Sequence, residues 1–188
     1  MTKKALRTKY KALRQELSES DIEEKSLAIA NQLLQLDIWD HSFYHLFLPI
    51  VSQKEVNTEY ILNVLQGKDK NVVLSKSNFE DYSMTHFLLT DTTVIKPNAY
   101  NIPEPVDGIE IQASQIDVVF VPLLAFDVNG HRVGYGKGFY DRFLSSCKPD
   151  TVKIGLSFFE AEAAFDTVDL NDVTLDYCVT TGATYNFL

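Results

Sequence analysis

The feature that most constrains the fold is the stretch IDVVFVP at residues 116–122, in which an apolar run, residues 118–121, follows Asp117 and is ended by a proline. A strand with apolar side chains on both faces has to be covered on both faces, so the run is typical of a central strand in a parallel sheet. Weaker strand patterns occur at residues 43–50, 71–76, 84–90, 152–158 and 177–181.

Helical patterns alternate with these strands. In residues 2–18 apolar side chains recur every three or four positions, and Ser20 with Glu23 is the signature of a capping box that opens a second helix to about residue 36. Two more helices are expected at residues 57–67 and 138–147. The alternation predicts an α/β fold of three layers, with a mostly parallel sheet covered by helices on both faces.

The remaining long segment, residues 95–108, carries three prolines and a glycine, and we expect an irregular surface loop there. Neither side of this loop has enough residues for a comfortable core of its own, so the chain is predicted to be a single domain, residues 1–188.

Composition narrows the class of protein. The net charge of −9 disfavours binding to nucleic acid, and no apolar run is long enough to span a membrane. The charged N-terminus lacks the apolar core of a signal peptide, and the two cysteines suggest reduced thiols. We therefore expect a cytoplasmic, monomeric protein that binds small molecules.

Positive charge gathers at two places in this acidic chain. The first 14 residues hold six cations and no acid, and residues 127–144, DVNGHRVGYGKGFYDRFL, combine cations with four of the eight glycines. Closely spaced glycines let backbone N–H groups converge on one point, and a following helix N-terminus favours anions. With Arg132 and Lys137 the stretch predicts a phosphate-binding loop.

An acid follows the glycines. Asp141 lies one helical turn after Lys137, and a carboxylate beside bound phosphate is most simply a magnesium contact. The stretch does not match the P-loop motif, because Phe139 follows Gly138. The residues alone leave open a plain glycine-rich turn with Asp141 and Arg142 as a surface pair.

Three blocks resemble one known family, the 5-formyltetrahydrofolate cyclo-ligases. They are KKALR at residues 3–7, FLPIVSQKEVNTEYI at residues 47–61 and VVFVPLLAFDVNGHRVGYGKGFYDRFL at residues 118–144. The resemblance implies that ATP and 5-formyltetrahydrofolate are converted to 5,10-methenyltetrahydrofolate, ADP and phosphate with Mg²⁺. It also implies a fold similar to that of sugar-phosphate isomerases and CoA transferases.

The resemblance implies roles for individual residues. Arg132 and Lys137 are the expected catalytic cations. Contacts to ATP are implied for Lys3, Lys4, Arg7, Arg132, Val133, Gly134, Tyr135, Gly136, Lys137, Gly138, Phe139 and Tyr140. Contacts to the folate are implied for Ile50 (with Leu48 as its rival), Glu55, Tyr135, Gly136, Lys137, Gly138 and Phe139. The metal is expected on Asp141 and Asp176, with Asp169 and Asp172 as rivals for the second position.

Other interpretations compete with this one. A different enzyme of the same fold would need an acid–base or nucleophilic constellation, which the chain does not show. A non-catalytic folate- or nucleotide-binding relative should have lost motif residues, yet Arg132, Lys137 and Asp141 are all present. Asp127 and Asn129 are interpreted as turn residues, and His131 as a structural residue, none of them with a chemical role.

Overall fold

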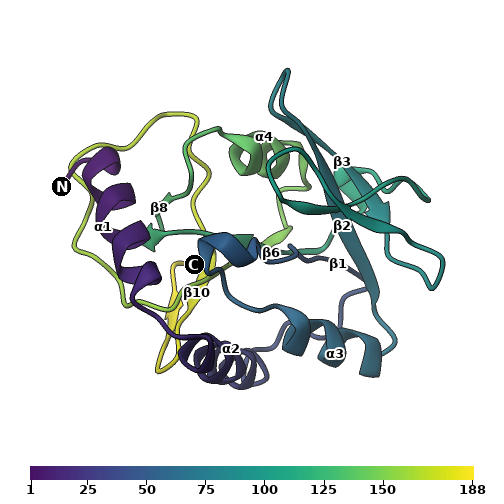
Figure 1. Cartoon of the computed structure of the whole chain (residues 1–188), viewed down its shortest axis with the longest axis horizontal. Coiled ribbons are helices and arrows are strands. Elements are labelled where there is room, and N and C mark those ends of the chain that lie inside the picture. Colours follow the sequence, from purple (N-terminus) through teal and green to yellow (C-terminus); the bar gives the residue numbers. More distant parts are fainter.

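The computed structural model describes residues 1–188 and is built on a seven-stranded sheet with the order β11-β10-β9-β6-β1-β2-β3 (Figure 1). Five strands run parallel, and the edge strands β3 and β11 are antiparallel to their neighbours. The strands are β1 (Phe43–His45), β2 (Asn71–Asn78), β3 (Ser83–Leu88), β6 (Val118–Pro122), β9 (Val152–Leu156), β10 (Tyr177–Val179) and β11 (Thr184–Asn186).

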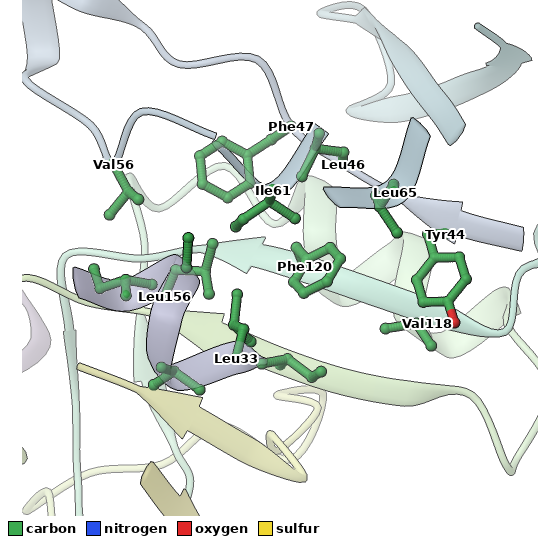
Figure 2. Close-up of a cluster of buried hydrophobic side chains, with 14 of the residues drawn as sticks. Leu33, Tyr44, Leu46, Phe47, Val56, Ile61, Leu65, Val118, Phe120 and Leu156 are labelled. Carbon is green, nitrogen blue, oxygen red and sulfur yellow. The ribbon is translucent and has the colours of Figure 1, made fainter. Parts of the chain in front are cut away.

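Both faces of the central strand β6 are buried, as its apolar run predicts. Val118 and Phe120 pack beneath α2 (Glu19–Leu33) and α3 (Glu59–Gly67), where Figure 2 shows them among Leu33, Ile61 and Leu65. Val119 and Val121 pack on the opposite face against Phe143 and Leu144 of α4 (Phe139–Ser146). The predicted mostly parallel α/β sheet with helices on both faces is therefore confirmed.

The N-terminal helix α1 (Lys3–Gln15) packs away from the sheet. Leu6 and Tyr10 form a small cluster with Leu124, Ala125 and Val133, which belong to the short ribbon of β7 (Ala125–Phe126) and β8 (Arg132–Val133) and the residue before it. Figure 1 shows α1 beside β8, although more than a hundred residues separate them in sequence. This contact brings the N-terminus next to the glycine stretch. No helix is long and apolar enough to cross a membrane.

Two local predictions are wrong. The capping box of α2 is formed by Ser18 and Asp21, not by Ser20 and Glu23: the Ser18 Oγ accepts from Asp21 N at 3.0 Å, and Asp21 Oδ2 accepts from Ser18 N at 2.8 Å. An aspartate at the third position can close the box as well as a glutamate, so the helix begins two residues earlier.

The segment predicted as an irregular loop forms a two-stranded ribbon, β4 (Ile95–Pro97) with β5 (Pro103–Pro105). Prolines are tolerated in such a ribbon because half of its N–H groups face away from the partner strand. The ribbon is attached to β2, where Ser77 N donates to Glu104 Oε2 at 3.1 Å. Two short 3-10 helices, η1 (Val51–Gln53) and η2 (Ala113–Gln115), complete the chain.

The sheet makes a testable demand on Gly155 in β9. A Cβ at this position would lie 2.6 Å from Leu123 Cδ2 and 2.7 Å from Leu175 Cδ1, inside the core. We expect Gly155→Ala to lower the free energy of unfolding by roughly 1–3 kcal/mol in urea denaturation. Gly67→Ala is the matched control, because a Cβ there meets nothing within 4 Å, and it should leave stability unchanged or slightly raised. Equal stabilities for the two variants would contradict this packing.

Candidate functional site

A cavity of about 410 Å³ opens at the carboxyl ends of β1 and β6. Leu46, Phe47 and Leu48 follow β1, Pro122 ends β6, and all four line the cavity. The chain winds from β1 towards β2 on one side and returns to β6 on the other, so β1 and β6 flank the switch point of the sheet. Ligands of open α/β sheets bind at such a crevice.

The glycine stretch forms one wall of this cavity. Gly136 and Gly138 have φ values of 97° and 75°, which side chains with a Cβ rarely adopt, and Gly138 is the N-cap of α4. Gly136 also permits a close approach, since a Cβ there would lie 3.0 Å from the Arg7 guanidinium carbon. The loop therefore directs the free N–H groups of a helix N-terminus towards the cavity beside a cation, which is the arrangement that binds anions.

Two of the predicted N-terminal cations reach the same wall. Arg7 Nε donates to Gly134 O at 2.9 Å, and Lys3 Nζ pairs with Asp169 Oδ2 at 2.6 Å and also with Asp172. Both Lys3 and Arg7 line the cavity, whereas Lys4 does not. The helix α1 thus supplies positive charge to a site whose other residues lie in the second half of the chain.

Glu55 is buried in the cavity wall, and its side chain is held at both oxygens. Ile50 N donates to Oε2 at 2.8 Å, and the Tyr135 hydroxyl donates to Oε1 at 3.0 Å. Burial raises the pKa of Glu55, and the bond from Ile50, the nearby charge of Arg14 and the bond from Tyr135 only partly offset it. Tyr135 packs against the α1 cluster, and its hydroxyl both accepts from Arg14 and donates to Glu55.

Arg14 is a residue that sequence reasoning did not connect with the site. Its guanidinium is buried, and it donates to the Tyr135 hydroxyl at 3.0 Å and to Leu123 O at the end of the central strand. The signal was present in the sequence: Leu6, Tyr10 and Arg14 recur every four residues, so the cation lies on the buried stripe of α1. A charged residue on such a stripe needs buried partners, and one of those of Arg14, Tyr135, lines the cavity.

Two carboxylates face the cavity near the N-terminus of α4. Asp141 Oδ1 pairs with Arg132 Nη2 at 2.8 Å and accepts from Val173 N at 3.1 Å, and Asp172 is held by Lys3. Asp176 lies outside the cavity, where its Oδ2 accepts from Lys153 N at 2.8 Å and pairs with Lys153 Nζ at 2.9 Å. The geometry thus groups Asp141 with Asp172, the rival candidate for the second metal position, rather than with Asp176.

The other predicted residues divide clearly. Leu48 and Ile50 both line the cavity, and so do Phe139 and Tyr140, whereas Val133 packs in the α1 cluster. The two turn residues have the structural role expected of them. The Asp127 carboxylate accepts from the backbone of Asn129, His131 and Phe165.

A doubly wound α/β fold, a glycine loop at a helix N-terminus and a cavity lined by cations and carboxylates are typical of an enzyme that acts on small molecules. A model of the 5-formyltetrahydrofolate cyclo-ligase family matches residues 1–181. The chain belongs to this family.

Individual relatives agree with this assignment. The chain is 27% identical to the 5-formyltetrahydrofolate cyclo-ligase of Mus musculus, with 93% of this chain and 91% of the mouse protein covered. It is also 27% identical to the Haemophilus influenzae cyclo-ligase, with 81% and 80% covered. The solved structure of the Aquifex aeolicus 5,10-methenyltetrahydrofolate synthetase superimposes with a TM-score of 0.84 at 28% identity, covering 100% of this chain and 93% of that one.

The contacts of Glu55 predict a measurable change. Since the hydroxyl of Tyr135 stabilises the charged form of Glu55, Tyr135→Phe should raise the already elevated pKa of Glu55 further. The pH dependence of folding stability has a definite sign. The buried Glu55 carboxyl keeps its proton above its ordinary pKa of 4.5, so its contribution to the stability of the fold is full at low pH and is lost as pH rises through the raised pKa. Titration of the Glu55 carboxyl carbon by NMR measures the shift.

Tyr60→Phe is the matched control for this titration, because the Tyr60 hydroxyl donates to another glutamate, Glu23, at 2.7 Å. This variant should leave the pKa of Glu55 unchanged. If Tyr135→Phe also leaves it unchanged, the hydroxyl is not a significant partner of Glu55.

Proposed function

We propose that the chain catalyses the ATP-dependent cyclisation of 5-formyltetrahydrofolate to 5,10-methenyltetrahydrofolate, with release of ADP and phosphate. The observation that carries this proposal is the convergence of motif residues on one cavity. Lys3 and Arg7 come from the first helix, Glu55 from the segment before α3, and Lys137 and Asp141 from the glycine stretch and α4. Together they supply cations for phosphate, an acceptor for the folate and a carboxylate for a metal.

The nucleotide phosphates belong at the glycine loop. The N-terminus of α4 offers free backbone N–H groups, and Arg7 and Lys137 add full positive charges around it. Lys137 is exposed, with its Nζ 5.8 Å from the centre of the Tyr82 ring, so it can turn towards a bound phosphate. Arg132 is fixed by Asp141 and by Val173 O, and it holds the metal-binding carboxylate in place.

The cavity fits a magnesium ion that is shared with the nucleotide. Mg²⁺ is usually bound by one or two carboxylates, phosphate oxygens and water rather than by a cage of protein ligands. Asp141 and Asp172 each use one oxygen in the contacts described above, and each keeps a second oxygen for the ion. The ion would neutralise phosphate charge during transfer.

The folate belongs in the part of the cavity that Glu55 lines. Glu55, when ionised, can accept N–H donors of the pterin, and Ile50, Tyr135 and Phe139 offer apolar and aromatic contacts beside it. Holding the formyl oxygen against the transferred phosphate, with N10 folded towards the formyl carbon, makes ring closure intramolecular. The chain needs no covalent nucleophile, because its residues position the reactants and stabilise charge.

A non-catalytic relative that only binds folate or nucleotide is the alternative, and the intact Lys137 and Asp141 disfavour it. The likeness to sugar-phosphate isomerases and CoA transferases supports no residue role of its own, since function resides in the site and not in the fold. We further infer a single domain, because strands from both halves of the chain join one sheet. A cytoplasmic, monomeric protein remains our expectation from the composition.

The activity is tested by following methenyltetrahydrofolate through its ultraviolet absorbance, with and without ATP. We expect product only with ATP. Loss of a charge-assisted contact costs roughly 10- to 100-fold, so Lys137→Ala should lower kcat/KM for ATP by about that factor. Lys96→Ala is the control, since Lys96 is an exposed lysine outside the cavity. A wild-type protein without ATP-dependent product would favour the binding-only alternative.

The metal assignment is tested by three matched aspartate variants. Asp141→Asn and Asp172→Asn should each raise the Mg²⁺ concentration for half-maximal activity by about 10-fold or more, because each removes a carboxylate from the cavity. Asp176→Asn should leave that concentration unchanged, since Asp176 pairs with Lys153 outside the cavity. The opposite ranking of Asp172 and Asp176 would overturn the assignment.

A further inference from the structure

Three hydrogen-bonded side chains, His45, Ser75 and His86, cross neighbouring strands of the sheet beside the cavity, and we call them the polar triad. The Ser75 Oγ on β2 lies 2.6 Å from His45 Nε2 on β1 and 2.7 Å from His86 Nδ1 on β3. Ser75 and His86 are directly paired across the two antiparallel strands. Phe143 of α4 packs against both imidazoles, at centroid distances of 4.7 Å and 4.2 Å, so the polar triad lies on the α4 face of the sheet.

Burial keeps the two imidazoles of the polar triad uncharged. It lowers the pKa of His86 to about 4 and also lowers the pKa of His45, so both imidazoles are neutral at neutral pH. A neutral imidazole carries one N–H and one lone pair. Three protons are therefore shared among the two rings and the hydroxyl.

The position of these protons follows from His45. This side chain is fully buried, and its Nδ1 has no hydrogen-bonding partner. A buried acceptor without a partner is tolerated better than a buried N–H without one, so the proton of His45 belongs on Nε2. His45 then donates to Ser75 Oγ. We assign the His86 proton to Nε2, which is not among the buried atoms that lack a partner, so the Ser75 hydroxyl donates its only proton to His86 Nδ1.

This arrangement leaves the Ser75 oxygen with one free lone pair and no free proton. Ser75 lines the cavity and is half-buried, whereas both histidines are buried. We propose that Ser75 is a substrate-binding residue that accepts a hydrogen bond from an N–H group of the reduced folate, with His45 and His86 as positioning residues. The proposal rests on the proposed function, because that function brings a folate into this cavity.

The surroundings of Ser75 favour the folate over the nucleotide phosphates. The groups nearest to the polar triad are neutral or aromatic, and the ring centroids of Tyr140 and Phe143 lie within 6.0 Å of that of His45. The cavity cations come instead from α1 and from the stretch that leads into α4. A phosphate has no N–H to donate, and an oxygen acceptor without nearby positive charge repels it. A reduced pterin carries several N–H donors.

The test compares two substitutions of equal shape. Ser75→Thr keeps the hydroxyl and Ser75→Val replaces it with a methyl group, so their difference isolates the hydroxyl. Binding of 5-formyltetrahydrofolate without ATP, and of ATP without folate, is measured by calorimetry. We expect Ser75→Val to bind the folate roughly 3- to 10-fold more weakly than Ser75→Thr, with equal ATP affinities. Thr85→Ala on the exposed, opposite face of β3 should match the wild type.

Equal folate affinities for the two variants would show that the polar triad has only a structural role. A difference in ATP affinity alone would assign Ser75 to the adenine of the nucleotide. If the Ser75→Val variant does not fold, a measurement on the wild-type protein still tests the proposal. The imidazole ¹⁵N resonances of His45 and His86 should shift with 5-formyltetrahydrofolate and not with ATP, and unshifted resonances overturn the proposal. A wild type that binds the folate without turning it over contradicts the proposed function alone.

Discussion

The site depends on the contact between the N-terminal helix and the glycine stretch. Arg14, buried on the inner stripe of α1, donates to Tyr135 and to Leu123 O, and Tyr135 in turn donates to Glu55. One guanidinium therefore joins the first helix, the end of the central strand and the segment before α3. A buried charge left without partners costs several kcal/mol, so these segments are held in one arrangement. Arg7 repeats the connection at Gly134 O.

This arrangement explains how an acidic protein can bind anionic ligands. With a net charge of −9, the chain as a whole repels phosphate. Its cations are concentrated where α1 meets the glycine loop, and acids neutralise some of them: Asp172 is paired with Lys3 and Asp141 with Arg132. The same pairs place carboxylate oxygens beside the proposed phosphate position. The site therefore offers cations for the phosphates and carboxylates for the metal ion, and a nucleotide bound with its metal requires both.

The sheet was predictable because its physics is local. In β6, Val118 to Val121 alternate between two apolar faces, and the sequence shows that pattern directly. The ribbon of β4 and β5 was missed because three prolines outweigh a short strand pattern, and its attachment to β2 through Glu104 is a tertiary contact. The glycine loop and the α1 cations were predictable from composition and resemblance. Arg14, Ser75 and His86 were not, because their importance arises only from neighbours distant in sequence.

The central claim is that both ends of the chain build one nucleotide site with the glycine loop. The most direct test is a crystal structure with a non-hydrolysable ATP analogue and Mg²⁺. The account predicts the triphosphate between Arg7 and the N-terminus of α4, with the ion on Asp141 and Asp172. Phosphates bound away from the glycine loop, or an ion on Asp176, would contradict it.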